Sequence, residues 1–319
     1  MWPADHKLQY IKYAGKNSKK SSGVNFECSL TSFNILLDGL EKHMSKGKKT
    51  TWLNRKRLVA NSINACNSDI VCLQEVNHKM LAELEPLVVC RSYIGFIGTT
   101  GRATHKKTFP MNNAILYDRE KFEVQPMTVK YNMTNFATIA EPELVDKENC
   151  YDWRCVAIIL KHKESGNSIC VQTVHLPSGE NDSDEADRLD VLQNEVEYLF
   201  GLDCVKPNVD AHIVCGDFNS SATMTKYYEN AVHPFMTEKK YIDLVKLATG
   251  GSSFNTYNDW VGACFDYVYL KTRTKNIGIS AELPHHQNVA SSTPIPDKEN
   301  GSDHVPLTVN IKCQEAETR

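Results

Sequence analysis

The chain has 319 residues, of which 41% are hydrophobic, and its formal net charge is −3. This composition supports a sizeable core and excludes global disorder, and the length fits one large α/β or two-sheet domain. The weakly acidic balance excludes a polycation, so contacts with a polyanion would depend on local basic patches.

The first residues are polar and carry several lysines, so we expect residues 1–24 to form a flexible or peripheral arm. They lack the apolar stretch of a secretory signal, and no apolar run is long enough to span a bilayer. The 11 cysteines are scattered, and none has the spacing of a zinc site. We therefore expect reduced thiols, no membrane contact, and a cytoplasmic or nuclear location.

The strand-like run FECSLTSFNILL follows residue 25. A helix is predicted over TWLNRKRLVANSINAC, with Thr50 or Thr51 as its N-cap. The short apolar run DIVCLQEV is typical of a buried strand. NNAILYDREKFEV indicates a strand, a turn and a second strand.

Two β-rich runs in RCVAIILKHKESGNSICVQTVHL flank the turn formers of residues 164–167 and predict a hairpin. Residues 184–200 are predicted to be helical, with apolar residues at helical spacing and acidic residues in the first turn. These apolar residues are Leu189, Leu192, Val196 and Leu199. Because strands outnumber helices, we predict two packed sheets with helices on the outside. Together they would form a single domain over residues 25–313, followed by a tail at residues 314–319.

Polar residues stand where the predicted strands stop. In HIVCGDFNSS an apolar strand ends at Gly216, which allows a close backbone approach, and Asp217 and Asn219 follow. Other strand ends carry Asn34, Glu75, His175, Asp266, Asp303 and His304. Each residue alone fits a turn, a cap or a hydrogen-bonded core histidine. Their recurrence along the whole chain instead favours a shared site.

This set of carboxylates, amides and histidines suits metal-assisted attack on a phosphate ester. Mg²⁺ prefers oxygen ligands and keeps several waters, so one or two carboxylates are enough to hold it, and Mn²⁺ can substitute. A histidine held by a carboxylate can transfer a proton. The sequence has no Gly-x-Ser-x-Gly elbow, no Walker loop and no Rossmann glycine fingerprint.

The ordered motifs FN, LQEV, HL, GDFNS, FDY and SDH, between residues 33 and 307, resemble the endonuclease/exonuclease/phosphatase superfamily. NSDIVCLQEVNH, DVLQNEV and HIVCGDFNS are most similar to the branch of nocturnin and the carbon-catabolite-repression-type deadenylases. The resemblance implies a deoxyribonuclease I-like, four-layer α/β/β/α sandwich of two mostly antiparallel sheets. It also implies Mg²⁺-dependent cleavage of phosphate esters.

The resemblance implies roles on the metal side of the site. Glu75 would be the principal metal ligand, and Asn34 would support the metal or the phosphate. Asp303 would be a peripheral carboxylate on the metal side.

The remaining residues would act on the scissile phosphate. Asp217 would be the base or would orient the water, and Asn219 would hold the phosphate. His304 would pair with Asp266, while His175 would contact the phosphate on the leaving-group side.

Two basic stretches are candidates for holding substrate phosphates. The first contains Lys42, Lys46, Lys48, Lys49, Arg55, Lys56 and Arg57, and the second contains Arg102, His105, Lys106 and Lys107. We favour the second, because this region commonly rims the cleft in the family. Arg154 would clamp a phosphate or pair on the surface. Pro177 and Trp260 lie where the branch packs a base, although Trp260 fits a core position equally well.

The segment after HLPSG departs from the branch because it is acidic. It contains Glu180, Asp182, Asp184, Glu185, Asp187 and Asp190 against only Arg188. These carboxylates would repel a polyanion, or they would form a solvated helix start that favours the helix dipole. Leucine-rich repeats are absent from the sequence, so we expect a monomer without repeat-mediated assembly.

The leading hypothesis is a Mg²⁺-dependent 3′-to-5′ exoribonuclease of the deadenylase type, releasing 5′-nucleotides from RNA. The acidic segment motivates an alternative, a nocturnin-like phosphatase of a small nucleotide such as NADP(H). A 2′,5′-oligoadenylate phosphodiesterase is a related alternative. A non-enzymatic alternative is a catalytically silent scaffold that binds partners, although none of the expected site residues is missing.

Overall fold

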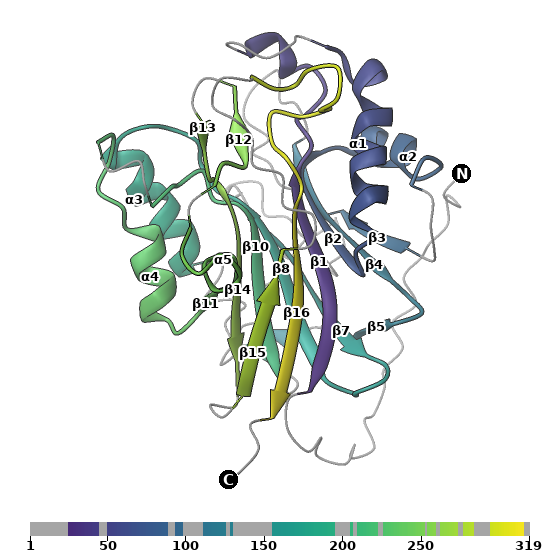
Figure 1. Ribbon diagram of the computed structural model, residues 1–319, viewed down its shortest axis with the longest axis vertical. Helices are drawn as coiled ribbons and strands as arrows, with labels where there is room; N and C mark the ends of the chain where they lie inside the picture. The colour runs from purple at the N-terminus through teal and green to yellow at the C-terminus, as the bar shows by residue number, and fades with distance from the viewer. Residues whose placement is uncertain are drawn as a thin grey trace.

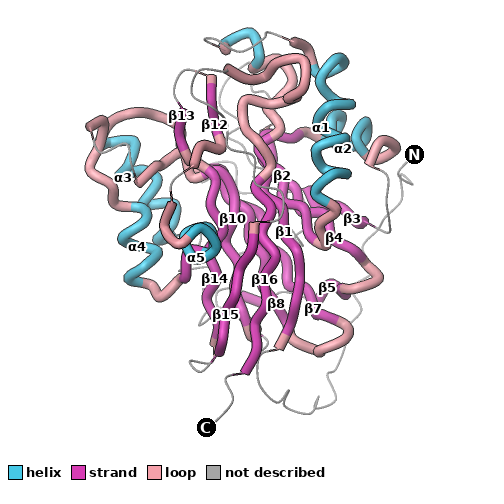
Figure 2. The backbone as a smooth tube through the Cα atoms, in the orientation of Figure 1, coloured by secondary structure: helices cyan, strands magenta, loops and turns pink. Residues whose placement is uncertain are grey.

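Two β-sheets lie face to face, and helices cover their outer faces (Figures 1 and 2). The computed structural model describes residues 25–44, 50–88, 93–97, 111–125, 128–129, 155–194, 205–206, 209–222, 226–252, 254–259, 262–273, 277–283 and 294–315. Within these ranges the layers follow the order helix, sheet, sheet, helix. This is the predicted four-layer α/β/β/α sandwich.

The first sheet has six strands in the described ranges. Their order is β15 (Ile277–Glu282), β16 (Leu307–Glu315), β1 (Phe26–Asn34), β2 (Ile70–Val76), β4 (Asn112–Asp118) and β3 (Tyr93–Ile97). β1 and β2 pair in parallel, and the other neighbours pair antiparallel.

The second sheet also has six strands among the residues described. Their order is β11 (Ile242–Asp243), β14 (Asp266–Thr272), β10 (Ala211–Asp217), β8 (Ser168–His175), β7 (Cys155–His162) and β5 (Phe122–Gln125). β8 and β10 are parallel, and the other neighbours are antiparallel. The antiparallel pair of β7 and β8 confirms the predicted hairpin. Short ribbons join β12 (Tyr257–Asn258) to β13 (Gly262–Ala263) and β6 (Thr128–Val129) to β9 (Val205–Lys206).

The outer layers consist of short helices. α1 (Trp52–Cys66) and α2 (His78–Leu84) cover the first sheet, and α3 (Asp182–Val191) and α4 (Val232–Glu238) cover the second. α5 (Leu244–Thr249) lies against β14 and β15, and a 3-10 turn, η1, spans Glu41–His43.

Two helix starts can be compared with their predictions. Thr51 is the N-cap of α1, although its side chain makes no capping hydrogen bond. α3 begins two residues before the predicted start, because Asn181 caps it and Asp184 completes a capping box. Residues 195–200 of that predicted helix lie outside the described ranges.

Alternate residues of each strand divide between the inner and outer cores. In β10, Ile213 and Cys215 pack between the sheets, whereas Val214 packs toward α3 and α4. The eight described cysteines are free thiols, and seven of them are buried. No described helix has the length and apolar character needed to cross a membrane.

Candidate active site

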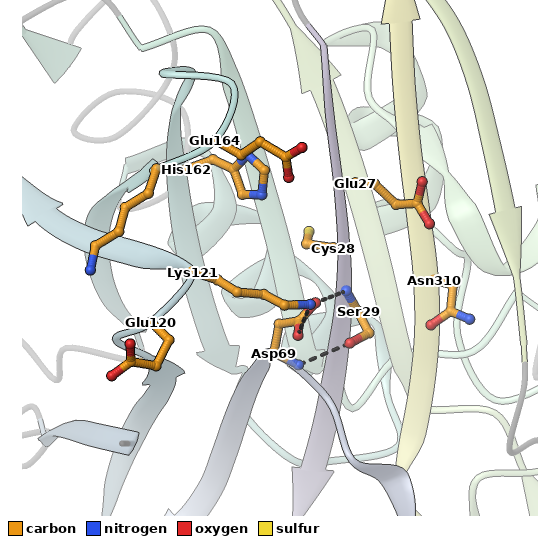
Figure 3. Close-up of a pocket in the computed structure, with 10 residues that line it drawn as sticks. Glu27, Cys28, Ser29, Asp69, Glu120, Lys121, His162, Glu164 and Asn310 are labelled. Carbon is orange, nitrogen blue, oxygen red and sulfur yellow. Dashed lines mark hydrogen bonds and ion pairs between the residues drawn. The ribbon is translucent and has the colours of Figure 1, made fainter. Parts of the chain in front are cut away.

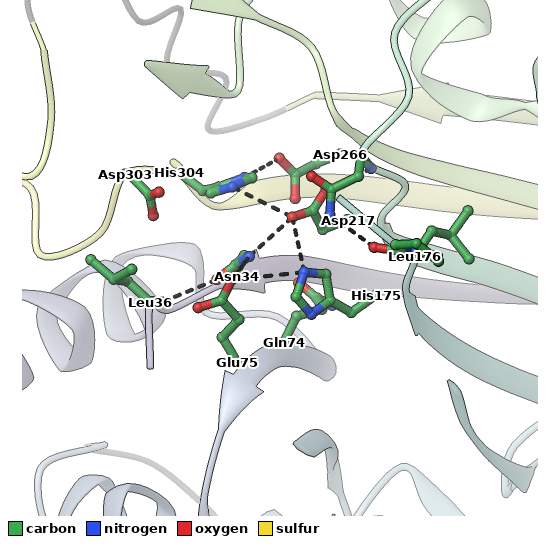
Figure 4. A network of polar contacts seen from close by, with 12 residues as sticks. Asn34, Leu36, Gln74, Glu75, His175, Leu176, Asp217, Asp266, Asp303 and His304 are labelled. Atoms are coloured by element: carbon green, nitrogen blue, oxygen red, sulfur yellow. Dashed lines mark hydrogen bonds and ion pairs between the residues drawn. The ribbon is translucent and has the colours of Figure 1, made fainter. Parts of the chain in front are cut away.

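Strand alternation brings polar side chains together at one end of the sandwich. Inner-face positions of β1, β8, β10 and β14 are mostly apolar, but polar residues take over toward one end and occupy the last position of each strand there. These polar residues are Asn34, His175, Asp217 and Asp266. Asp217 is in register with both His175 and Asp266. All four side chains therefore meet between the two sheets (Figure 4).

Glu75 reaches the same site through a β-bulge. Ile70 and Cys72 of β2 face the inner core, so plain alternation would turn residue 75 outward. The register between β2 and β4 shifts between Leu73 and Val76, and Glu75 has a left-handed backbone with φ of 56°. After this bulge Val76 packs in the outer core, and the Glu75 side chain joins the polar cluster. Bulges commonly re-aim side chains beside active sites.

Asn34 links the two sheets within the cluster. Its Nδ2 donates to Glu75 Oε1 at 3.1 Å and to Asp217 Oδ2 at 3.0 Å. Its Oδ1 accepts from the backbone N of Leu36 at 3.0 Å, and Glu75 Oε2 accepts from the backbone N of Leu37 at 3.0 Å. The chain just after β1 therefore orients both the amide and the carboxylate.

His304 lies between two aspartates, with a hydrogen bond to one and an ion-pair contact to the other. Its Nδ1 bonds Asp266 Oδ2 at 2.8 Å, and its Nε2 lies 3.5 Å from Asp217 Oδ2. Burial alone would lower the pKa of His304, but Asp266 and Asp217 outweigh it and raise the pKa to about 10. The imidazole is therefore cationic at neutral pH, and the predicted pairing of His304 with Asp266 is confirmed.

His175 and Asp303 lie on either side of this group. His175 Nε2 is 3.7 Å from Glu75 Oε1 and 3.7 Å from Asp217 Oδ2. Asp303 Oδ1 accepts from Ser302 Oγ at 3.3 Å, and the same hydroxyl donates to the backbone O of Asn34 at 2.7 Å. Burial and the nearby charge of Glu75 raise the pKa of Asp303 to about 7, against the opposing effect of His304.

Asn219 completes the set from the loop after β10. Its backbone is left-handed with φ of 47°, which asparagine tolerates better than most residues. Its backbone N donates to Asp217 Oδ1 at 2.8 Å, and its Nδ2 donates to the backbone O of Leu176 at 2.9 Å. Leu36, Glu75 and Asn219 are thus three left-handed non-glycine residues in one small region, where strain of this kind often accompanies function.

Gly216 allows β10 to approach β8 closely beside the site. Its φ is 142°, and a Cβ there would lie only 2.0 Å from the backbone O of Val174. Glycine before Asp217 is therefore required by the packing of the two strands whose ends carry Asp217 and His175.

The eight side chains predicted at strand ends thus converge, and their catalytic roles stay predictions. Among the predicted substrate-binding residues, Arg154, Lys106, Lys107 and Trp260 lie outside the described ranges. Pro177 is half-buried just after His175, and its carbonyl accepts from Arg188 Nε at 2.8 Å.

The first basic stretch needs a correction. Arg55 is 1% exposed, so it cannot meet a substrate phosphate. Lys56 pairs with Glu83 at 3.0 Å, while Arg57 is exposed. The sequence pattern misled because Arg55 occupies the inner side of α1, where backbone carbonyls surround it.

The acidic segment has mainly structural partners. Glu185 is 1% exposed and Arg188 is 0% exposed, and they form an ion pair of 2.8 Å. Glu185 also accepts from Ser220 Oγ at 3.0 Å, close to Asn219. Asp184 belongs to the capping box, and Asp182 accepts from the backbone N of Glu229. Of the six acidic residues, only Glu185 is buried, whereas Glu180, Asp182, Asp187 and Asp190 are exposed.

A cavity of about 530 Å³ lies elsewhere, at the start of β1 and β2 (Figure 3). It is lined by Glu27, Cys28, Ser29, Asp69, Glu120, Lys121, His162, Lys163, Glu164 and Asn310. Lys121 is paired with Asp69 at 2.6 Å, and acidic residues outnumber lysines in the lining. This composition is unsuited to a phosphate, and the cavity shares no residue with the polar cluster.

Comparison with known protein families matches residues 31–304 to the endonuclease/exonuclease/phosphatase family. Human nocturnin is 26% identical over 280 residues, covering 83% of this chain and 59% of that protein. Human 2′,5′-phosphodiesterase 12 is 22% identical over 293 residues, covering 81% and 46%. The Ccr4 3′-5′-exoribonuclease subunit of the CCR4-Not complex from Candida albicans is 25% identical over 306 residues, covering 82% and 38%.

The chain thus spans about half the length of these curated relatives. Among solved structures, the human nocturnin catalytic domain with a bound sulfate anion has a TM-score of 0.60 and 21% identity. The superposition covers 91% of this chain and 97% of that structure, which shows the same fold.

Proposed function

Since this chain belongs to the endonuclease/exonuclease/phosphatase family, we propose that it is a phosphoric ester hydrolase of the branch of nocturnin and the CCR4 deadenylases, and that it cleaves RNA. The proposed activity is that of a Mg²⁺-dependent 3′-to-5′ exoribonuclease of the deadenylase type, releasing 5′-nucleotides. The similarity to an exoribonuclease subunit supports this choice of substrate.

One observation carries the proposal. Glu75, Asn34 and Asp217, from strand ends of both sheets, are joined by hydrogen bonds, and His304 adjoins Asp217 through an ion-pair contact of 3.5 Å. Carboxylates are buried here beside a cationic imidazole, which is an arrangement suited to proton transfer and to charge that develops on a phosphate.

The donor chemistry fits Mg²⁺. Glu75, Asn34 and Asp303 offer carboxylate and amide oxygens, which are the hard ligands that this ion prefers. No three described His, Cys, Asp or Glu side chains form a ready-made metal cage. We propose a hydrated ion held by one or two carboxylates. When bound, Mg²⁺ would polarise the phosphoryl oxygens and offset the charge that develops on them.

The protein side chains would handle the water and its proton. Asp217 Oδ2 would accept a proton from the attacking water while the water oxygen bonds to phosphorus. Asn34 and the cationic His304 fix the position of that carboxylate oxygen. Asp266 keeps the His304 ring oriented through Nδ1, so its Nε2–H points toward Asp217.

The other two groups would act on the phosphate and the leaving group. Asn219 would orient a phosphate oxygen without adding charge. His175, through Nε2, would hydrogen-bond the phosphate on the side of the departing 3′-oxygen, which takes up a proton as its bond to phosphorus breaks. In this arrangement the negatively charged phosphate would face the amide of Asn219 and the imidazole of His175.

A time course on 5′-labelled RNA with an adenosine tail tests the proposal. Wild type should shorten the RNA from its 3′ end with Mg²⁺ and should be inactive with EDTA. Glu75→Gln and Glu75→Ala should be inactive too, because the loss of a metal ligand removes several kcal/mol of transition-state stabilisation, on the order of 3 kcal/mol.

Glu83→Gln is the matched control, since it removes a carboxylate on α2 whose hydrogen bonds in the described part of the chain go to Lys56 and Trp52. It should retain wild-type activity. RNA that stays intact under all conditions would refute the exoribonuclease. A single internal cut would indicate an endonuclease instead.

The similarity to 2′,5′-phosphodiesterase 12 favours a second candidate, a phosphodiesterase of 2′,5′-linked oligoadenylate. Feeding that linkage in parallel with 3′,5′-linked RNA separates the two. The phosphatase of a small nucleotide such as NADP(H) keeps less support, because Glu185 and Asp184 of the acidic segment are engaged within the fold. Phosphate release from NADPH would restore it. The hypothesis of a catalytically silent scaffold would be supported if the protein cleaved none of these phosphate esters and calorimetry detected no Mg²⁺ binding.

The proposed setting is the cytoplasm or the nucleus, with RNA or a nucleotide as the partner and the protein as a monomer. The free thiols of the described cysteines support a reducing compartment. Sedimentation of the purified chain would check the monomer.

A further inference from the structure

Arg55 of α1 donates only to backbone carbonyls in the described part of the chain. Its Nε bonds Thr50 O at 2.9 Å, and its Nη2 bonds Leu36 O at 2.7 Å. Its Nη1 bonds both Ile35 O at 2.9 Å and Gly301 O at 2.6 Å. The side chain is 1% exposed and also stacks over Trp52.

Two of these contacts lie next to the candidate site. Ile35 and Leu36 directly follow Asn34, whereas Gly301 comes shortly before Asp303 and His304. One guanidinium therefore joins the loop of Ile35 and Leu36 to the loop of Gly301, a residue 246 positions from Arg55 in the sequence. Ser302 strengthens the same junction by donating to the backbone O of Asn34.

Gly301 shows how tightly the second loop is pressed against α1. A Cβ at this glycine would lie 2.9 Å from Val59 Cγ2, 3.0 Å from Val59 N and 3.1 Å from Arg55 O. The loop can reach the guanidinium only because residue 301 has no side chain. This close packing is an observation independent of the Arg55 hydrogen bonds.

The charge of Arg55 is also matched to its surroundings. Burial lowers the pKa of its guanidinium, while Glu41, Asp303, Asp38 and Glu75 oppose this effect and favour the charged form. Lysine could not replace it, because a compact ammonium cannot span several carbonyls in the fixed fork of a guanidinium.

We propose that Arg55 is a positioning residue for phosphate ester cleavage, which sets the loop after Asn34 and the loop of Asp303 and His304 relative to each other. This inference rests on the proposed function. Arg55 acts through the two loops and does not touch the substrate, because its side chain is buried beneath them.

Arg55→Met, Arg55→Lys and Gly301→Ala test the inference against wild type. On adenosine-tailed RNA, kcat should fall on the order of 100-fold, as expected for a misplacement of about 1 Å. KM should stay within about threefold, because no substrate contact is removed. Arg55→Lys should not rescue kcat. Gly301→Ala displaces the loop while Arg55 remains, so it provides a second route if Arg55→Met fails to fold.

Ile63→Ala is the matched control, since it creates a cavity in the same helix and its apolar side chain cannot hydrogen-bond the loop carbonyls. It should lower stability but leave kcat unchanged. A loss of kcat in Ile63→Ala equal to that in Arg55→Met, or a wild-type kcat in Arg55→Met, would overturn the inference.

Amide hydrogen exchange gives a readout that needs no substrate. The amides of Leu36 and Leu37 donate to Asn34 and Glu75, and the amide of Val305 donates to Thr256 O. These amides alone should exchange faster in Arg55→Met and Gly301→Ala. A uniform increase over the whole chain, as in Ile63→Ala, would reduce Arg55 to a stabilising residue. If wild type cleaves no phosphate ester, the proposed function fails, and the exchange pattern still decides whether Arg55 positions both loops.

Discussion

Gly216→Ala should uncouple the two strands that carry His175 and Asp217. Gly216 lies in β10 beside Val174 of the parallel strand β8. Its φ of 142° is a conformation that residues with a side chain rarely adopt. The substitution adds one methyl group, yet that group has no space.

The structure allows the cost to be estimated. The added Cβ would lie 2.0 Å from Val174 O, which is well short of the 3.4 Å at which ordinary contact begins. The obstacle is backbone, so the strands must separate or residue 216 must change its φ. Backbone strain of about 1–3 kcal/mol and one or two lost ladder hydrogen bonds of about 1 kcal/mol each give a total of about 2–5 kcal/mol. A shift of about 1 Å between His175 and Asp217 should lower kcat on the order of 100-fold.

Urea unfolding and steady-state cleavage of adenosine-tailed RNA measure the two effects. Gly166→Ala is the matched control in the turn between β7 and β8, where φ is 75° and no heavy atom lies within 4 Å of the added Cβ. It should cost about 1 kcal/mol through backbone strain alone and leave kcat unchanged. If Gly216→Ala matched Gly166→Ala in both assays, the reasoning from the close approach of β8 and β10 would be wrong.

Three further predictions concern buried titratable groups. Glu185→Gln leaves Arg188 buried without its ionic partner, so the free energy of unfolding in urea should fall by about 3–5 kcal/mol. Asp187→Asn, at an exposed position of the same helix, should change it little, and equal losses would contradict the buried pair. Burial, with a smaller effect of Lys271, lowers the pKa of His212 from 6.5 to about 3. The unfolded chain binds this proton below pH 6.5 and the native state does not, so unfolding becomes easier as the pH falls through that window. Between pH 8 and pH 5 wild type should lose about 2 kcal/mol more stability than His212→Gln, and parallel curves would refute the effect. Asp266→Asn keeps a hydrogen-bonding group beside His304 but removes the charge, so kcat for RNA cleavage should fall on the order of 100-fold or more with an unchanged fold. A kcat near that of wild type would argue against a role for the pair.

The local pattern of the sequence was enough to predict the strand ends of the site. Apolar runs that stop at Asn34, His175 and Asp217 carry their own signal, because a strand alternates its faces and Asp, Asn and other polar residues are disfavoured inside strands. The order of these motifs also predicted the family and the four-layer fold. The hairpin of β7 and β8 followed from its turn formers for the same local reason.

Burial of single charged residues could not be predicted in this way. Arg55 stood in a basic run and was interpreted as a candidate phosphate ligand, yet its acceptors come from residues 35, 36, 50 and 301. Glu185 and Arg188 stood in an acidic run, yet they pair beneath the surface. Glu75 was predicted as a site residue, but the β-bulge that turns its side chain into the site was not predicted.

The sequence by itself therefore determined the strands, their polar ends and the chemical character of the site, because these depend on neighbours along the chain. Only the tertiary structure decided which charges are buried, which loops Arg55 joins, and why residue 216 must be glycine. Those features depend on carbonyls and backbone atoms contributed by distant segments, and no local pattern records the distance between segments that meet only in the folded protein.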